Sequence, residues 1–167
     1  MNNKTLRGVC LAVTAALVAV FTMFISFPTG IGYVNLGDAV ILFSAFLLGP
    51  MAGIPAALGS ALSDLLLGYA VYAGATLLIK GLMGFLCGML LRRGGETWGR
   101  RILAFAAAEC VMAAGYFVFE IFCYGFAAAL GSVPLNLLQG AAAIVCASAL
   151  APSKPAIMRA LKNKGIF

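Results

Sequence analysis

Between Gly8 and Leu91 the chain carries only three charged residues, Asp38, Asp64 and Lys80. A soluble domain has a charge at about every fourth position, and one small core cannot bury so long an apolar run. Over the whole chain, 63% of the residues are hydrophobic and 10% are charged, and the mean hydropathy is +1.08. These values indicate that lipid surrounds most of the molecule, and they argue against soluble enzymes and nucleic-acid-binding proteins.

Proline, glycine and charged residues divide the apolar sequence into six segments. A helix of roughly 20 apolar residues crosses the hydrocarbon core of a bilayer. We therefore predict an all-α integral membrane protein, a single membrane domain over residues 1–167. Its six transmembrane helices are expected at about 9–27, 36–48, 51–67, 74–91, 102–127 and 134–150. The first segment is about twice as long as the apolar part of a signal peptide, which favours a membrane helix.

The basic residues lie in three clusters outside these helices. One cluster precedes the first helix, one lies between the fourth and fifth, and one follows the sixth. Together they hold all but one of the 11 Lys and Arg residues: Lys4, Arg7, Arg92, Arg93, Arg100, Arg101, Lys154, Arg159, Lys162 and Lys164. The positive-inside rule places all three clusters in the cytoplasm. Six crossings agree with this, so we expect cytoplasmic N and C termini.

Several kinds of chemical site are missing from the sequence. It contains no His, and its five Cys residues lie apart in apolar runs without a C-x-x-C pair. We expect these cysteines to be small buried hydrophobic residues rather than disulfides or zinc ligands. No G-x-x-x-x-G-K-[ST] loop for ATP is present. We predict no cofactor, no metal and no enzymatic activity.

Small residues recur at spacings of four within the predicted helices. The pairs and rows are Ala12/Ala16, Ala15/Ala19, Gly49/Gly53/Ala57/Ala61 and Gly84/Gly88. Such faces let helix backbones approach closely in a membrane. We expect most of them to pack within the bundle, whereas the Ala face of the first helix is also suited to another membrane subunit.

Polar side chains gather near the predicted outer ends of five helices. Ionisable groups inside a membrane are costly and are candidates for function. The set that we predict to bind a substrate is Asn35, Asp38, Asp64, Tyr72, Lys80, Tyr116, Glu120, Asn136 and Gln139. Only Glu109 lies in the inner half. One polar layer at one end of the helices predicts an outward-facing pocket.

The segment before the second helix is expected to take part in this pocket. The second helix covers only about 20 Å of a core about 30 Å thick, so residues 28–35 must reach below the outer surface. Irregular backbone at that depth requires protein or a wet cavity beside it. Gly30, Gly32 and Gly37 suit a loop that folds over a ligand.

Structural roles for the same residues remain open. Asp38 also fits a cap at the start of the second helix. Lys80 also fits a counter-ion for Asp64 or Glu120. For Glu109 a structural hydrogen bond is favoured over a proton relay. The outer tyrosines also suit an interfacial belt; they are Tyr33, Tyr69, Tyr72 and Tyr124.

Short motifs over most of residues 8–150 resemble those of a known family. The most specific is Gly32-Tyr33-Val34-Asn35-Leu36-Gly37-Asp38-Ala39-Val40, followed by Leu48-Gly49-Pro50. Weaker pieces are Ser63-Asp64-Leu65-Leu66-Leu67-Gly68, Thr76-Leu77-Leu78-Ile79-Lys80-Gly81, Gly115-Tyr116 with Glu120, and Pro134-Leu135-Asn136-Leu137-Leu138-Gln139. The chain resembles the S components of energy-coupling factor (ECF) transporters, in the riboflavin-transporter-type subgroup.

This resemblance implies a subunit of six helices in a prokaryotic plasma membrane that captures a vitamin or related micronutrient from outside. In that family, a separate transmembrane T subunit and two cytoplasmic ATPases drive import. Small residues on the first helix contact the T subunit, and Ala12, Ala16 and Ala19 match that pattern. We also expect contact with membrane lipid and none with nucleic acid.

The residues themselves narrow the ligand. Asp38, Asp64 and Glu120 outnumber Lys80, so we expect a neutral or weakly cationic heterocycle. Hydroxymethylpyrimidine, a pyridoxine-like vitamer and riboflavin all fit, whereas a folate fits poorly. The alternative hypotheses are a self-sufficient small carrier or channel, with these groups as an ion path, and an assembly factor that binds no ligand. The sequence shows no internal repeat of the kind that many carriers have.

Overall fold

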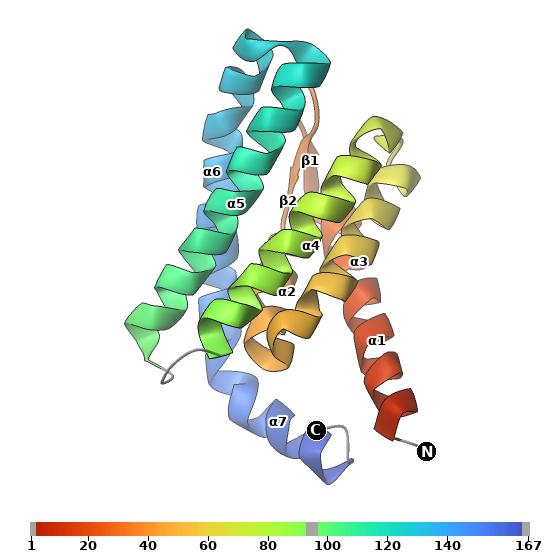
Figure 1. Ribbon diagram of the computed structural model, residues 1–167, viewed down its shortest axis with the longest axis vertical. Coiled ribbons are helices and arrows are strands. Elements are labelled where there is room, and N and C mark those ends of the chain that lie inside the picture. Colours follow the sequence, from red (N-terminus) through yellow and green to blue (C-terminus); the bar gives the residue numbers. More distant parts are fainter. Residues whose placement is uncertain (1–2, 93–96, 165–167) are drawn as a thin grey trace.

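The computed structural model describes residues 3–92 and 97–164 and shows a helical bundle (Figure 1). Its helices are α1 (Asn3–Phe24), α2 (Gly37–Leu48), α3 (Gly53–Leu66), α4 (Ala70–Arg92), α5 (Trp98–Tyr124), α6 (Phe126–Leu150) and α7 (Lys154–Asn163). Two 3-10 turns, η1 (Gly49–Ala52) and η2 (Ala151–Ser153), follow α2 and α6. Strands β1 (Ser26–Pro28) and β2 (Tyr33–Asn35) form an antiparallel hairpin between α1 and α2.

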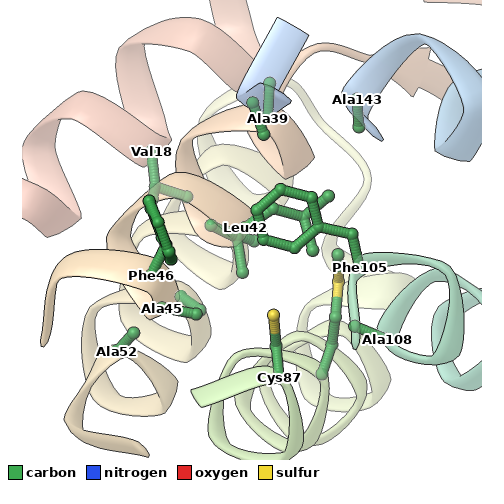
Figure 2. Close-up of a cluster of buried hydrophobic side chains, with 14 of the residues drawn as sticks. Val18, Ala39, Leu42, Ala45, Phe46, Ala52, Cys87, Phe105, Ala108 and Ala143 are labelled. Atoms are coloured by element: carbon green, nitrogen blue, oxygen red, sulfur yellow. The ribbon is translucent and has the colours of Figure 1, made fainter. Parts of the chain in front are cut away.

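Helix α2 lies at the centre of the core. Its residues Leu42 and Phe46 are packed among side chains from other helices, including Val18 of α1, Cys87 of α4 and Phe105 of α5 (Figure 2). Because neighbouring helices surround α2, apolar residues occupy most of its length, and the charged Asp38 is completely buried in its first turn.

Glycines allow η1 and α3 to approach α4 very closely. A Cβ added at Gly88 would lie 2.1 Å from the carbonyl carbon of Gly49, and one at Gly53 would lie 2.7 Å from the carbonyl oxygen of Gly81. Side chains at these positions would collide with backbone, so the contact depends on glycine. The prediction that the small-residue rows on these helices pack within the bundle is confirmed.

The sixth helix begins earlier than predicted. The predicted helix starts at Pro134. The structure instead starts α6 at Phe126 and keeps Pro134 inside it. A single residue, Gly125, with φ of 85°, turns the chain from α5 into α6. Glycine adopts this left-handed conformation without a steric penalty.

Two other elements were not predicted. Residues 28–35 were expected to be an irregular loop, and residues 26 and 27 the end of the first helix; the structure ends α1 at Phe24 and forms the β1–β2 hairpin, with Phe27 opposite Val34. Beyond α6, the short helix α7 leaves the lower end of the bundle in Figure 1, and none of its residues is buried. Helix α1 begins at that same end, whereas the hairpin lies toward the opposite end of the bundle and packs against α1 and α6.

Five stretches of the described residues are long and apolar enough to cross a membrane. They are Lys4–Phe24, Gly37–Leu66, Ala70–Arg92, Trp98–Tyr124 and Phe126–Asn163. The second stretch combines α2, η1 and α3, whose two helices have 12 and 14 residues, or about 18 and 21 Å of length. An all-α membrane architecture therefore fits, while six separate spans remain a prediction.

Candidate functional site

A polar cavity lies between the hairpin and the surrounding helices. Of the nine residues predicted to bind a substrate, eight line it: Asn35, Asp64, Tyr72, Lys80, Tyr116, Glu120, Asn136 and Gln139. They come from β2 and from α3, α4, α5 and α6. The structure therefore brings together residues that the sequence had placed in one layer, and their contact with a ligand stays a prediction.

The cavity is small. Its volume is ≈ 40 Å³, which is room for roughly three water molecules. The other residues that line it are Thr22, Thr29, Gly32, Tyr33, Val34, Ser60, Thr76, Ser132 and Leu135. The mixture of hydroxyl, amide, charged and aromatic groups is typical of a site that holds a small polar ligand in one orientation.

Two tyrosine hydroxyl groups hold the hairpin against the helices. Tyr33 donates a hydrogen bond of 2.5 Å to Oδ1 of Asp64 on α3. Tyr72 on α4 donates one of 2.9 Å to the carbonyl oxygen of Ile31. Burial raises the pKa of the Tyr33 phenol, and the Asp64 carboxylate raises it further, so Tyr33 stays protonated and acts as a donor.

A third connection joins the hairpin to α6. The backbone N–H of Asn35 donates to Oε1 of Gln139 at 2.7 Å, and Nε2 of Gln139 donates to Oδ2 of Asp38 at 2.5 Å. The ammonium group of Lys80 donates to the other oxygen, Oδ1, of Asp38 at 2.5 Å. This network links β2, α2, α4 and α6 around one carboxylate.

Asp38 is the one predicted substrate-binding residue that is not among the described residues lining the cavity. Its side chain is completely buried and bonds to Lys80 and Gln139. It makes no side-chain capping bond at the start of α2. The pairing of Lys80 with Asp38 also differs from the expected pairing with Asp64 or Glu120. The position of Asp38 along the helix was predicted from the sequence. The direction of its side chain was not, because it depends on the rotation of the buried helix α2 about its own axis.

Glu120 lies at the α5 side of the cavity and is 4% exposed. Its Oε1 lies 3.3 Å from the Tyr72 hydroxyl oxygen, whose single hydrogen is shared with the Ile31 carbonyl oxygen at 2.9 Å, and its Oε2 is hydrogen-bonded to the Ser132 hydroxyl of α6. Hydroxyl groups from α4 and α6 therefore contact both oxygens of this carboxyl. The Glu120 carboxyl is therefore an oriented hydrogen-bond acceptor for any ligand that contacts it.

Aromatic rings form a cluster beside these polar groups. Tyr72 stacks with Tyr124, with ring centroids 6.0 Å apart, and meets Phe119 at 5.1 Å and Tyr116 at 6.2 Å. The Tyr33 and Tyr69 rings lie 4.8 Å apart. Tyr33, Tyr72 and Tyr116 line the cavity, which brings ring faces within reach of a bound heterocycle.

Polar atoms without partners are present in the cavity wall. Within the described part of the chain, Asn136 Nδ2, Asp64 Oδ2 and Thr22 Oγ1 are buried and have no hydrogen-bond partner. Unsatisfied buried donors and acceptors are costly and rare in folded proteins. A ligand with complementary donors and acceptors would remove that cost.

Glu109 does not make, with any described residue, the structural hydrogen bond that was expected from the sequence. Its side chain is 6% exposed on α5, and neither carboxyl oxygen has a hydrogen-bond partner among residues 3–92 and 97–164. The predicted structural hydrogen bond is therefore wrong. Glu109 packs against α6 where Gly140 leaves space, since a Cβ there would lie 3.1 Å from Oε2 of Glu109.

Several hydroxyl residues of the cavity were missed because serine and threonine are common in membrane helices. A spacing of four residues was available as a signal. Thr76 lies one turn from both Tyr72 and Lys80 on α4, and Ser60 and Ser132 lie one turn before Asp64 and Asn136. Residues four apart share a helix face, so these hydroxyl groups could have been added to the predicted set.

The predicted partner surface on α1 is divided between two faces. Ala12 and Ala16 are exposed, whereas Ala19 is buried. The backbone oxygen of Ala19 accepts a hydrogen bond of 3.3 Å from Ser63 of α3. The structure therefore removes Ala19 from the partner surface and leaves Ala12 and Ala16, because residues four apart share one side of a helix.

The fold and the site define a small multi-pass membrane protein with a polar cavity beside a hairpin. The family model "ECF-type riboflavin transporter, S component" matches residues 2–154. The chain belongs to this family and is a substrate-binding S component of an ECF transporter. The resemblance drawn from the sequence motifs is thereby confirmed.

Two relatives extend this comparison. An uncharacterized protein from Pyrococcus woesei, encoded in a "gap 3'region", is 32% identical over 137 residues, covering 81% of this chain and 91% of the relative. The thiamine precursor transporter HmpT of Lactococcus lactis subsp. cremoris (strain MG1363) is 29% identical over 157 residues, covering 91% of this chain and 90% of HmpT. Both similarities extend over most of each chain.

Proposed function

We propose that this S component captures a thiamine precursor, and specifically a single-ring pyrimidine such as hydroxymethylpyrimidine. The observation that carries the proposal is the small cavity lined by tyrosine rings and by oriented amide, carboxyl and ammonium groups. The similarity to HmpT along nearly the whole chain supports the same ligand class.

The size of the cavity favours one ring over three. The cavity volume is ≈ 40 Å³, so a larger ligand requires more displacement of the surrounding side chains. A pyrimidine or a pyridoxine-like ring requires the smallest displacement of side chains, and the three fused rings of riboflavin require the largest. Tightly packed side chains resist such displacement, so the smaller ligands are favoured.

The polar groups favour an aminopyrimidine among the single-ring ligands. Asp64 Oδ2 is a buried acceptor without a partner, and Asn136 Nδ2 is a buried donor without a partner in the described residues. An amino group donates and a ring nitrogen accepts, so an aminopyrimidine offers the complement of both. Because Asp38 is paired with Lys80, the remaining carboxyl groups favour a neutral or weakly cationic ring.

The proposed topology has six crossings with both termini in the cytoplasm. Helices α2 and α3 then cross as two short helices joined at η1. The arrangement in Figure 1 supports this, since α1 begins at the same end of the bundle as η1 and α7. Exposed basic residues, including Arg159 and Lys162 of α7, lie at that end, as the positive-inside rule requires.

The proposed partners are a transmembrane T subunit and two cytoplasmic ATPases. This assignment rests on the family and on the exposed face of α1. Ala12 and Ala16 lie one turn apart there, and small residues at this spacing let another helix approach closely. Import would then use ATP hydrolysis by the partners.

The function can be tested by identifying what the protein binds. After purification in detergent from cells grown in rich medium, we expect mass spectrometry to find about one bound pyrimidine per chain, and Glu120→Ala to lose it. Thermal stabilisation should be largest with hydroxymethylpyrimidine, compared with thiamine, pyridoxine and riboflavin. Ser153→Ala, which removes an exposed hydroxyl in η2, is the control. Stabilisation by riboflavin alone would overturn the pyrimidine assignment, and binding of none of these compounds would favour a carrier or an assembly factor.

A further inference from the structure

Asp38 is buried at the centre of the hydrogen-bond network behind the cavity. Its relative exposure is 0%, and its two oxygens accept from different helices, Oδ1 from Lys80 of α4 and Oδ2 from Gln139 of α6. A charge in this position is stable only when its partners are in place. Asp38 therefore determines where two cavity side chains lie.

The bond to Asp38 orients the Gln139 amide. An amide has one donating side and one accepting side. Because Nε2 points to the Asp38 carboxylate, Oε1 points away from it and accepts the backbone N–H of Asn35 at 2.7 Å. If the amide were reversed, Oε1 would face the carboxylate and Nε2 would face the N–H, and both contacts would become repulsive. The Asp38 carboxylate therefore determines that the oxygen of the Gln139 amide, and not its nitrogen, faces strand β2.

The ion pair places the Lys80 ammonium group in the cavity wall. One of its three N–H donors is used by Asp38, and the nitrogen lies 5.3 Å from the centroid of the Tyr116 ring. Lys80 lines the cavity and is almost completely buried. Its long side chain has many rotamers in principle, so a fixed partner is required to keep the charge in one position.

We propose that Asp38 is a positioning residue: without touching the ligand, it places the Lys80 ammonium and keeps the hairpin closed over the cavity through Gln139. The part of the proposal that concerns the ligand rests on the proposed function. The part that concerns the hairpin does not, because the contacts from Asp38 to Asn35 are formed within the chain.

Hydrogen exchange of the ligand-free protein tests the hairpin directly. In Asp38→Asn we expect the amide of Asn35 in β2 to exchange at least about tenfold faster, because the hydrogen bond that protects it is weakened. Peptides from the middle of α5 should be unchanged. Ser44→Ala is the matched control, since Ser44 is also buried on α2 but its hydroxyl donates to the Ile41 carbonyl oxygen of its own helix.

A double substitution distinguishes positioning from a general effect on folding. Asp38→Asn with Gln139→Glu exchanges the amide and the carboxylate across their hydrogen bond and keeps the net charge of the network. Asn can then donate to the Glu carboxylate, whose other oxygen can still accept from the Asn35 N–H. We expect this variant to recover protection of β2 to within about threefold of wild type, whereas Gln139→Glu alone, with two facing carboxylates, should lose it.

Ligand binding provides the second measurement. For hydroxymethylpyrimidine we expect Asp38→Asn to raise the Kd at least about tenfold, mainly through faster dissociation, and the double variant to restore most of the affinity. The proposal is overturned if β2 exchange in Asp38→Asn equals that of wild type, or if exchange rises equally in β2 and α5. If wild type binds no pyrimidine, the proposed function fails, and the exchange measurement still decides the role of Asp38.

Discussion

Lys80 of α4 and Asp38 of α2 form an ion pair with 2.5 Å between Nζ and Oδ1, and both side chains are buried. Two charges removed from water contribute little net stability as a pair, but loss of one partner leaves an uncompensated buried charge. Because Lys80 lines the cavity and α2 is the central helix of the core, this pair connects the site to the fold.

Removal of the Lys80 charge should therefore destabilise the protein strongly. We expect Lys80→Met to cost about 3–5 kcal/mol of unfolding free energy, because Asp38 is left without its partner. Thermal unfolding in detergent measures the loss. Lys162→Met, at an exposed position of α7, should have little effect. If the Lys80→Met variant unfolds at the wild-type temperature, the ion pair between Lys80 and Asp38 does not form in the purified protein.

Much of the site was predictable from where polar residues interrupt apolar helices. Asn136 and Gln139 on one helix, and Tyr116 and Glu120 on another, share a face by their spacing alone. Both pairs line the cavity. Such residues stand out because a polar side chain at membrane depth is costly unless it has a partner or faces a cavity.

The direction of Asp38 and the form of the hairpin could not be predicted in this way. Helix α2 is apolar on nearly every side, so the sequence contains no periodicity that defines which face Asp38 occupies. Strands β1 and β2 have only three residues each, too few for an alternating pattern. Their pairing depends on contacts with helices distant in sequence, such as the bond from Tyr33 to Asp64.

The close contact between α4 and η1 provides a prediction for stability. Gly88→Ala should destabilise the protein by about 1–3 kcal/mol, since its Cβ would lie 2.1 Å from the carbonyl carbon of Gly49. Gly74→Ala on the same helix meets no atom within 4 Å and should be neutral or stabilising. Thermal unfolding of the two variants side by side checks the contact, and equal unfolding temperatures would contradict it.

The Asn136 amide provides a prediction for affinity. Asn136→Ala should raise the Kd for hydroxymethylpyrimidine by about 10-fold or more, because a hydrogen-bond donor in the cavity wall is removed. Stability should change little or increase, since Nδ2 has no partner within the described residues. Isothermal titration calorimetry and thermal unfolding measure the two effects. Asn163→Ala, at the end of α7, is the control, and equal affinity of both variants would remove Asn136 from the site.

Substitutions on α1 separate the partner surface from the bundle. Ala12→Leu and Ala16→Leu enlarge exposed positions, so we expect both to retain ligand affinity and stability but to abolish uptake with the coupling module, because a close helix contact is blocked. Ala19→Leu should instead lower the unfolding temperature, since Ala19 is buried beside Ser63 of α3 and overpacking typically costs about 1–3 kcal/mol. Uptake in cells that express the coupling module, compared with binding by the purified variants, makes the distinction. Normal uptake by Ala12→Leu and Ala16→Leu would show that this face contacts lipid rather than a partner.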